Sequence, residues 1–374
     1  MILEIKEVLN SSDLNKFIDF PHDLYKGDSN YVPEIYLAMK DHLNQAKNPY
    51  FKHSTAAFYL AYWEGKIVGR ISATINTNYN KFHNSNVGWF GFFDCIENYE
   101  VASQLLNTAK SYIKTNGAES MLGPANLTTN DTAGLLIDGF DSPPVVQMTY
   151  NKKYYPLYFD TWGLKKEMDM FAYFIPTVGV NEKALQLSER IQARLEDKGI
   201  KFRNVNMKKF KAELDGIHSI YNQAWENNWG FVPTTKEEFD FIGEGLKLAV
   251  DDRYVFIAED AGKIIAFAVG LPDLNEIAIK LKKGRILPFG IFKLLFGKKK
   301  VSKIRIILLG VIPEYRKMGI EAVFFANFIS KAKQNGLLGG EASWVLESNE
   351  MMVKAAEHLN GKKYKTYRIY SKAI

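Results

Sequence analysis

The chain has 374 residues, of which 47% are hydrophobic, 14% aromatic and 24% charged, so it is not disordered or fibrous, and two globular domains are expected. Its net charge is +6, but residues 277–305 hold ten basic and no acidic residues, so the rest of the chain is net acidic. A single cysteine excludes an intramolecular disulfide, and the six histidines lack the paired spacing of zinc ligands, so we expect no metal.

The N-terminus and the longest apolar stretch bear on where the protein resides. Glu4 and Lys6 interrupt the apolar N-terminal run, which therefore does not resemble an export signal. The longest apolar stretch, residues 286–296, contains Lys293 and is shorter than the roughly 20 residues that cross a bilayer. Together with the lone cysteine, these features predict a cytoplasmic protein.

Two segments roughly 200 residues apart predict matching β-hairpins. Residues 58–69 (FYLAYWEGKIVG) and 255–266 (VFIAEDAGKIIA) each place a glycine, Gly65 or Gly262, between two β-rich runs. A second pair, in which Gly163 corresponds to Gly361, recurs at nearly the same offset. We therefore predict a duplication, with equivalent turns at equivalent points of two similar halves.

Between these landmarks each half predicts a strand followed by a helix. In the first half these are residues 87–96 and 101–114, with Gly117 ending the helix; in the second they are 304–311 and 320–333, with Gly336. A helix at 181–198 and a strand at 200–205 join the halves. The expected fold class is α+β, of the three-layer α/β type. Domains 1–178 and 179–374 would each be a mixed, mostly antiparallel sheet flanked by helices.

The basic segment, residues 277–305, is an insertion in the second half. Apolar residues such as Ile286, Phe289 and Phe292 are interleaved with its lysines. This pattern is typical of a segment that contacts an anionic membrane or covers a lipid-like acyl chain, and also of a helical flap that packs on its own domain. Nothing in it resembles a module that reads a nucleic-acid groove, so no nucleic-acid partner is expected.

The most informative stretch is residues 308–322, LLGVIPEYRKMGIEA. Pro313 ends a strand, and the following turn opens a helix whose first N–H groups lack intrahelical partners. Such a terminus binds anions; Gly319 allows close approach of the backbone, and Arg316 can add a charge-assisted hydrogen bond. Glu321 lies in the same turn, where a carboxylate would repel an anion.

This stretch resembles motif A of the GNAT (Gcn5-related N-acetyltransferase) superfamily, with Glu321 where a second glycine or alanine is common. In the first half, residues 123–131 (GPANLTTND) and the glycines, prolines and aromatic residues that follow up to residue 151 resemble a bacterial subgroup with tandem GNAT-like domains, so that the resemblance covers nearly the whole chain. It implies that acetyl-CoA or a longer acyl-CoA binds to the C-terminal domain as co-substrate. The residues expected to hold this cofactor are Leu309, Val311, Arg316, Lys317, Met318, Gly319, Ile320, Glu321 and Asn349.

Two later segments extend the resemblance. Residues 341–349 are similar to the GNAT strand that diverges from its neighbour and opens a slot for the pantetheine arm, and residues 364–370 resemble the closing strand. Glu357 occupies the position where most GNAT enzymes have a tyrosine that protonates the leaving thiolate. The general acid is therefore unassigned, and Glu341 and Glu347 are the candidate bases.

The first half lacks a glycine-containing turn after its strand and is expected to shape the acceptor side. Asn126, Asn130 and Asp131 lie in a polar loop, where such residues either bind a substrate or form local turns. Trp344, on the diverging strand of the second half, is a further candidate for substrate binding.

The leading hypothesis is acyl transfer from acyl-CoA to an amine acceptor. A backbone N–H near Val311 would polarise the carbonyl, and a carboxylate or relayed water would remove the amine proton. One alternative is a non-catalytic duplicated scaffold that binds CoA or another ligand, which Glu321 and the missing tyrosine favour. Another is a membrane-associated acyltransferase acting on a lipid or cell-envelope precursor. The acceptor, the acyl length and the oligomeric state remain open.

Overall fold

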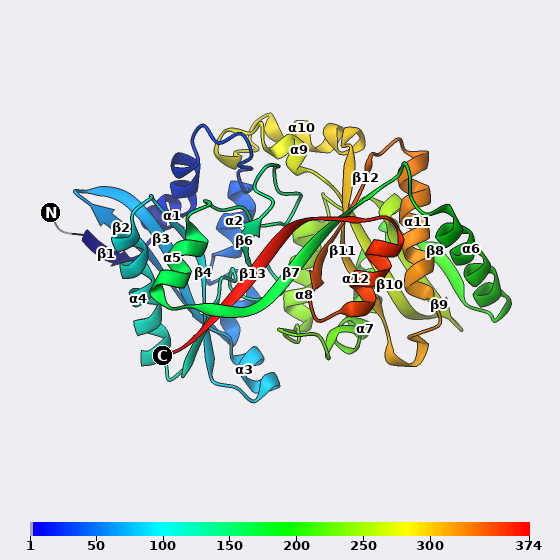
Figure 1. The fold of residues 1–374 in the computed structure, drawn as a ribbon, viewed down its shortest axis with the longest axis horizontal. Helices are drawn as coiled ribbons and strands as arrows, with labels where there is room; N and C mark the ends of the chain where they lie inside the picture. The colour runs from blue at the N-terminus through cyan, green and yellow to red at the C-terminus, as the bar shows by residue number, and fades with distance from the viewer. Residues whose placement is uncertain (1–2) are drawn as a thin grey trace.

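The computed structural model describes residues 3–374 and contains one mixed sheet of 13 strands flanked by helices (Figure 1). The strand order is β1-β2-β3-β4-β5-β13-β7-β12-β11-β10-β9-β8, and β6 pairs with β13 beside this path. The predicted α+β class with a mixed, mostly antiparallel sheet is confirmed. No helix within residues 3–374 is long and apolar enough to cross a membrane.

The first half contains seven strands and five α-helices. They are β1 (Leu3–Glu7), α1 (Ser11–Leu24), α2 (Tyr36–His42), β2 (Thr55–Trp63), β3 (Lys66–Ile75), α3 (Thr77–His83), β4 (Val87–Cys95), α4 (Tyr99–Thr115), β5 (Ser120–Gly123), β6 (Leu135–Asp138), α5 (Tyr155–Trp162) and β7 (Lys165–Pro176).

After a first helix, α6, the second half repeats this order from β8 on, with α9 and α10 in the place of α3 and without a counterpart of β6. Its elements are α6 (Glu182–Asp197), β8 (Lys201–Asn204), α7 (Phe210–Trp225), α8 (Lys236–Leu246), β9 (Val255–Asp260), β10 (Lys263–Pro272), α9 (Asn275–Ala278), α10 (Gly290–Gly297), β11 (Lys303–Val311), α11 (Ile320–Gln334), β12 (Gly339–Leu346), α12 (Glu350–His358) and β13 (Lys362–Ala373). The predicted strands and helices of both halves are confirmed to within two residues at each end.

The two predicted hairpins occupy equivalent places, β2-β3 and β9-β10. Glu64 and Gly65 have φ values of 49° and 76°, and Ala261 and Gly262 have 47° and 78°. Two consecutive residues with positive φ are typical of the type I′ turn, whose twist matches that of the flanking strands.

The second predicted match is displaced by one residue. Gly163 has φ 93° after α5, whereas the residue with positive φ after α12 is Asn360, at 61°, and not Gly361. Asparagine tolerates this left-handed conformation better than other non-glycine residues, so it can replace glycine there.

The two halves exchange their last strands. β7 pairs with β12 of the second half, β13 pairs with β5 of the first, and β7 and β13 pair with each other at the centre of the sheet (Figure 1). The expected boundary between residues 178 and 179 falls between β7 and α6. Because of the exchange, the part of the sheet on each side of the centre includes one strand from the other half.

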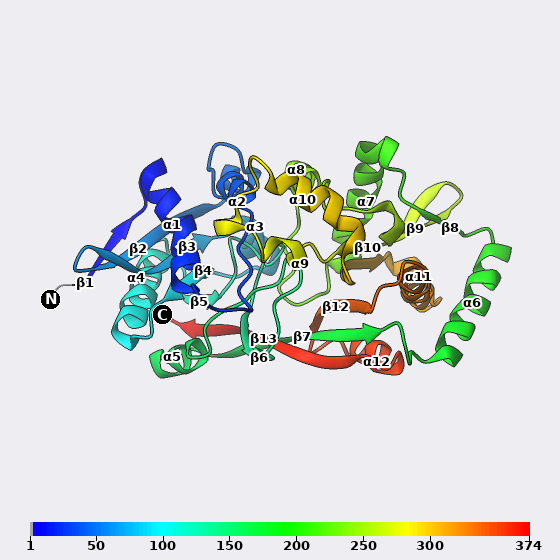
Figure 2. The same ribbon diagram turned by 90° about the horizontal axis from the view of Figure 1, so that it is seen from above.

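Helices cover both faces of the sheet (Figure 2). On one face α4 and α5 pack in the first half, and α6, α11 and α12 pack in the second. The apolar residues spaced along α4 are fully buried there: Val101, Leu105, Leu106, Ala109 and Ile113. On the other face lie α1 and α2, and α7 and α8. The loops of the two halves meet on this second face.

Candidate active site

The parallel strands β11 and β12 diverge after a short paired stretch. They pair from Lys303–Gly339 to Ile306–Ala342, and beyond that point β11 pairs only with β10, and β12 only with β7. Bulges interrupt the β10–β11 and β12–β7 ladders at the same level, where bulges commonly redirect side chains. The divergence predicted from residues 341–349 is therefore present.

The equivalent divergence in the first half is closed. β4 and β5 pair from Val87–Ser120 to Trp89–Leu122, and the chain after β5 then bonds back to β4. The amide of Ala125 donates to the carbonyl of Phe90 at 2.8 Å, and the amide of Phe92 donates to Asn126 Oδ1 at 2.8 Å. Within residues 3–374, no segment bonds in this way to the edge of β11 that faces β12.

The turn after β11 has the backbone of an anion site. A short 3₁₀-helix, Pro313–Tyr315, is followed by Lys317 with φ 64° and by Gly319 with φ 88°, and α11 begins at Ile320. The amides of residues 317–320 have no acceptor in the described chain. Left-handed residues next to a helix N-terminus form concave sets of free N–H groups that bind anions.

The structure differs from the sequence-based expectation at two charged residues of this turn, Arg316 and Glu321. Arg316 Nη2 donates to the carbonyl of Ala224 at 3.1 Å, and Nε donates to that of Val311 at 3.3 Å, so the guanidinium ties the turn to the end of α7. Burial raises the pKa of Glu321. A raised pKa weakens the repulsion between Glu321 and a bound anion, because the neutral form becomes more accessible.

Helix α7 connects the turn to the first half. Gly310 of β11 leaves room for the Trp225 ring, since an added Cβ would lie 2.5 Å from that ring. Tyr221 stacks on Trp225 with ring centroids 4.9 Å apart, and its hydroxyl donates to Asn130 Oδ1 at 3.2 Å. The first-half loop 126–131 is thereby fixed relative to β11.

A buried chain of hydrogen bonds lies where β11 and β12 begin to diverge. Arg305 is 1% exposed, and its Nε donates to Ser343 Oγ at 2.9 Å. Ser343 Oγ in turn donates to Glu341 Oε1 at 2.5 Å, and the Tyr364 hydroxyl donates to Glu341 Oε2. Arg305 Nη1 also donates to the carbonyl of Gln147 at 2.7 Å, so the first half completes the cluster.

Ionisable groups of the cluster and near it are buried. Burial lowers the pKa of Arg305 to about 10 and that of Lys365 to about 8, and it raises the pKa of Asp273 to about 7. The indole Nε1 of Trp344 and the hydroxyl of Tyr367 are buried without a hydrogen-bond partner in the described chain. Buried unpaired donors are unusual in native proteins and mark places where a bound group can be accepted.

The two candidate bases lie in different environments. Glu341 is 1% exposed inside the buried cluster. Glu347 follows β12 near the surface, where it accepts bonds from Lys166 Nζ at 2.7 Å and from the amide of Asp169 at 3.0 Å.

The other candidate site residues of the second half lie on β11, on β12 and at the start of α12. Trp344 lies beside Arg305, with the guanidinium carbon 4.9 Å from the centre of the indole. Asn349 caps α12 by accepting a bond from the amide of Met352 at 3.2 Å. Leu309 and Val311 lie on the part of β11 that no longer pairs with β12.

Among the candidate site residues of the first half, Asn126 and Asn130 form hydrogen bonds that hold the fold together. Besides closing β4, Asn126 donates to Thr132 Oγ1 at 2.8 Å, and Asn130 donates to the carbonyl of Val232 at 3.0 Å across the junction of the halves. Asp131 is different, because its partly exposed carboxylate lies 3.7 Å from His42 Nε2. Burial raises the pKa of Asp131 to about 6.

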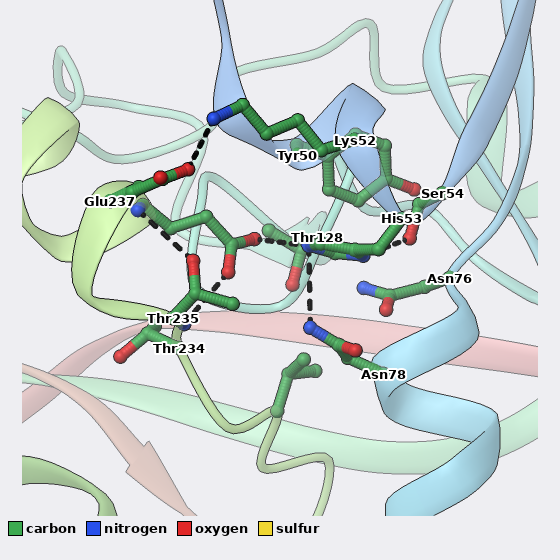
Figure 3. Close-up of polar contacts among 12 residues, drawn as sticks. Tyr50, Lys52, His53, Ser54, Asn76, Asn78, Thr128, Thr234, Thr235 and Glu237 are labelled. Atoms are coloured by element: carbon green, nitrogen blue, oxygen red, sulfur yellow. Dashed lines mark hydrogen bonds and ion pairs between the residues drawn. The ribbon is translucent and has the colours of Figure 1, made fainter.

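A second polar contact fixes α8 against the first half (Figure 3). Lys52 and Glu237 point toward each other, with Nζ and Oε2 2.5 Å apart. His53 Nε2 lies 3.0 Å from Glu238 Oε1, and its Nδ1 lies 2.7 Å from Ser54 Oγ. Sequence reasoning found neither this contact nor His42, because their partners are distant in the chain and no motif marks them.

The chain is similar to two known proteins over nearly its whole length. It is 35% identical to Protein YghO of Escherichia coli (strain K12), over 99% of this chain and 95% of the relative. It is 34% identical to the bacterial ceramide synthase of Caulobacter vibrioides, over 100% of this chain and 98% of the relative. The chain belongs to the family of these two proteins. No family model matches the sequence.

Solved structures show that this family member has the tandem GNAT fold. A tandem GNAT protein from the clavulanic acid biosynthesis pathway matches with a TM-score of 0.60 and 9% identity, covering 100% of this chain and 98% of that one. A GCN5-related N-acetyltransferase from Sphaerobacter thermophilus matches with a TM-score of 0.53 and 11% identity, covering 99% and 95%. The resemblance to the GNAT superfamily is confirmed at the level of the fold.

Proposed function

We propose that this family member is an acyl-CoA-dependent N-acyltransferase whose acceptor is a long-chain amine. The observation that carries the proposal is the divergence of β11 and β12 next to the free amides of residues 317–320. The acceptor class rests on the similarity to a relative called bacterial ceramide synthase. A ceramide is the amide of a fatty acid with a long-chain amino alcohol. Because acyl-CoA is an intracellular metabolite, we place the reaction in the cytoplasm.

In this proposal the second half binds the acyl-CoA. The amides of residues 317–320 would hold the pyrophosphate, and Lys317 would add a positive charge. The pantetheine arm would lie between β11 and β12, against Leu309 and Val311, with Asn349 near its end. The closed β4–β5 edge offers no equivalent space, because residues 124–127 fill it.

The first half would supply the acceptor side. The backbone of residues 146–147 reaches the buried cluster through Arg305, and the amide of Val146 donates to Asp273 Oδ1 at 2.9 Å. The Asp131 carboxylate, ionised above about pH 6, would attract the ammonium group of the amine. His42, beside it, could accept a proton from that group.

The ammonium group loses one proton to become the nucleophilic amine, the amine loses a second proton as it is acylated, and one proton reaches sulfur. We propose Glu341 as the general base, acting through the Ser343 hydroxyl, which already donates to it. The amine nitrogen attacks the thioester carbon and gives up its proton along this path, the C–S bond breaks, and the CoA thiolate takes a proton from solvent as it leaves. A free N–H on the diverging edge of β11 would stabilise the oxyanion.

An assay of CoA thiol release tests this function. Palmitoyl-CoA is offered with a long-chain amino alcohol (sphinganine), with ethanolamine, or with no amine, and the products are identified by mass spectrometry. We expect thiol release that depends on sphinganine and an amide of the corresponding mass. Release without any amine would indicate a hydrolase, and CoA binding without release under all conditions would indicate a non-catalytic scaffold; either result contradicts the proposal.

A further inference from the structure

Helix α10 and the residues just before it turn several large apolar side chains away from the protein. Phe289, Phe292 and Phe296 follow one another at helical spacing and are 73%, 54% and 75% exposed. Leu287 and Leu295, beside them, are 63% and 41% exposed. Folding normally buries such a stripe, because exposed aromatic surface is unfavourable in water.

The same helix is anchored by its opposite side. Leu294 and Ile286 pack on a small core that includes Val32 of the first half. Arg285 bonds to both carboxylate oxygens of Asp19 at 2.9 Å and stacks on the Tyr36 ring. The interpretation of the basic segment as a helical flap that packs on the protein therefore holds for one face of α10 only. The exposed face is held in place by contacts with both halves.

The segment that carries the exposed stripe also has lysines without carboxylate partners. Lys283 pairs with Asp23, Arg285 with Asp19 and Lys303 with Asp273, and Arg305 is buried. Lys298 donates to two backbone carbonyls, those of Leu248 and Val250. The exposed lysines of the segment that form no ion pair in the described chain are Lys280, Lys282, Lys293, Lys299 and Lys300.

The position of α10 makes this face accessible. It lies at the outer edge of the molecule above the junction of the two halves, close to α9 (Figures 1 and 2), and Arg285, just before it, stacks on Tyr36 of α2. The segment that carries it leads from Asp273, which bonds the first-half loop, to Arg305 of the buried cluster. A surface bound by α10 would therefore lie on the side of the molecule where the two halves meet.

We propose that the α10 face, defined as Leu287, Phe289, Phe292, Leu295, Phe296 and the five unpaired lysines, docks on a bilayer that contains anionic phospholipid. Aromatic and leucine side chains enter the interfacial region, and lysines beside them attract anionic headgroups. A second copy of the chain is disfavoured as occupant, because two such faces would bring unpaired lysines together. Docking does not depend on the identity of the acceptor amine.

Vesicle co-sedimentation tests the docking face in the full-length protein. The vesicles are phosphatidylcholine alone or phosphatidylcholine with roughly 30% phosphatidylglycerol, an anionic lipid. We expect the protein to prefer the anionic vesicles, and salt raised to about 1 M, where the Debye length is about 3 Å, to release it. A Lys299→Glu/Lys300→Glu variant should bind at least about twenty-five-fold more weakly, because each lysine near the surface contributes about fivefold and the new carboxylates are repelled. Phe292→Ser/Phe296→Ser should lose about tenfold or more.

Matched changes on α6 and its flanks control for nonspecific effects. Lys183→Glu/Lys201→Glu makes the same change of charge, and Val178→Ser/Leu187→Ser removes similarly exposed apolar groups, which are 87% and 56% exposed. Both controls should bind like the wild type, and all variants should keep the wild-type melting temperature. The proposal is overturned if the wild type does not prefer anionic vesicles, or if the control pairs weaken binding as much as the α10 pairs.

Discussion

A Glu341→Gln variant is expected to lose about 10²- to 10⁴-fold in the rate of amide formation, the range that a positioned general base contributes. Glutamine keeps the size of the side chain; one of the hydroxyls of Ser343 and Tyr364 can turn to accept from its NH2 group, while the other still donates to its carbonyl oxygen. The variant should therefore fold and bind CoA normally while lacking the carboxylate that takes the proton. The measurement is kcat for thiol release with the long-chain amine under saturating acyl-CoA.

Two further variants separate catalysis from structure. Glu347→Gln changes a carboxylate near the surface that bonds Lys166, so its kcat should stay within about threefold of wild type, as for an exposed ion pair. Glu341→Asp should recover part of the activity, because it restores the charge at a slightly different place. Wild-type activity of Glu341→Gln would remove Glu341 from the proposed proton path.

A Gly319→Val variant is expected to bind CoA about tenfold or more weakly, equivalent to about 1.4 kcal/mol. The added side chain obstructs approach of a phosphate to the amides of residues 317–320. Gly319 also has φ 88°, and an added Cβ would lie 3.0 Å from Ile191 Cγ2, so some loss of stability accompanies the loss of affinity. Calorimetry with CoA gives the affinity, and urea unfolding gives the stability.

Gly336→Val is the matched control for this change. Gly336 follows α11 at the opposite end, with φ 70° and no atom within 4 Å of an added Cβ. Valine there meets similar backbone strain, about 1–2 kcal/mol, away from the proposed phosphate site. Its affinity for CoA should equal that of the wild type. If both variants bind CoA like the wild type, the phosphates are not held by this turn.

The local elements were predictable because their patterns are local. Apolar spacing along α4, the glycines of the two hairpin turns and Pro313 at the end of β11 each mark structure within a few residues. The backbone of the turn after β11 was predictable for the same reason, since Gly319 and the start of α11 are adjacent in the sequence; binding of an anion there stays a prediction.

The pairing between distant segments was not predictable in this way. β7 and β13 have similar aromatic-rich sequences, and neither specifies whether it completes its own half or the other. The side chain of Asn126 suits a substrate site as well as it suits the closure of β4. Arg305 was counted with an exposed basic segment, yet it is buried, because its partners Ser343 and Gln147 come from other parts of the chain.

Hydrogen exchange with a non-transferable thioether analogue of palmitoyl-CoA tests most directly whether the second half alone holds the cofactor. If it does, the analogue will slow exchange at the amides of residues 308–322 and 343–349 and leave residues 88–101 and 123–131 unchanged. Protection of residues 88–101 and 123–131 instead, with no change at 317–320, would place the cofactor in the first half and contradict the proposed site.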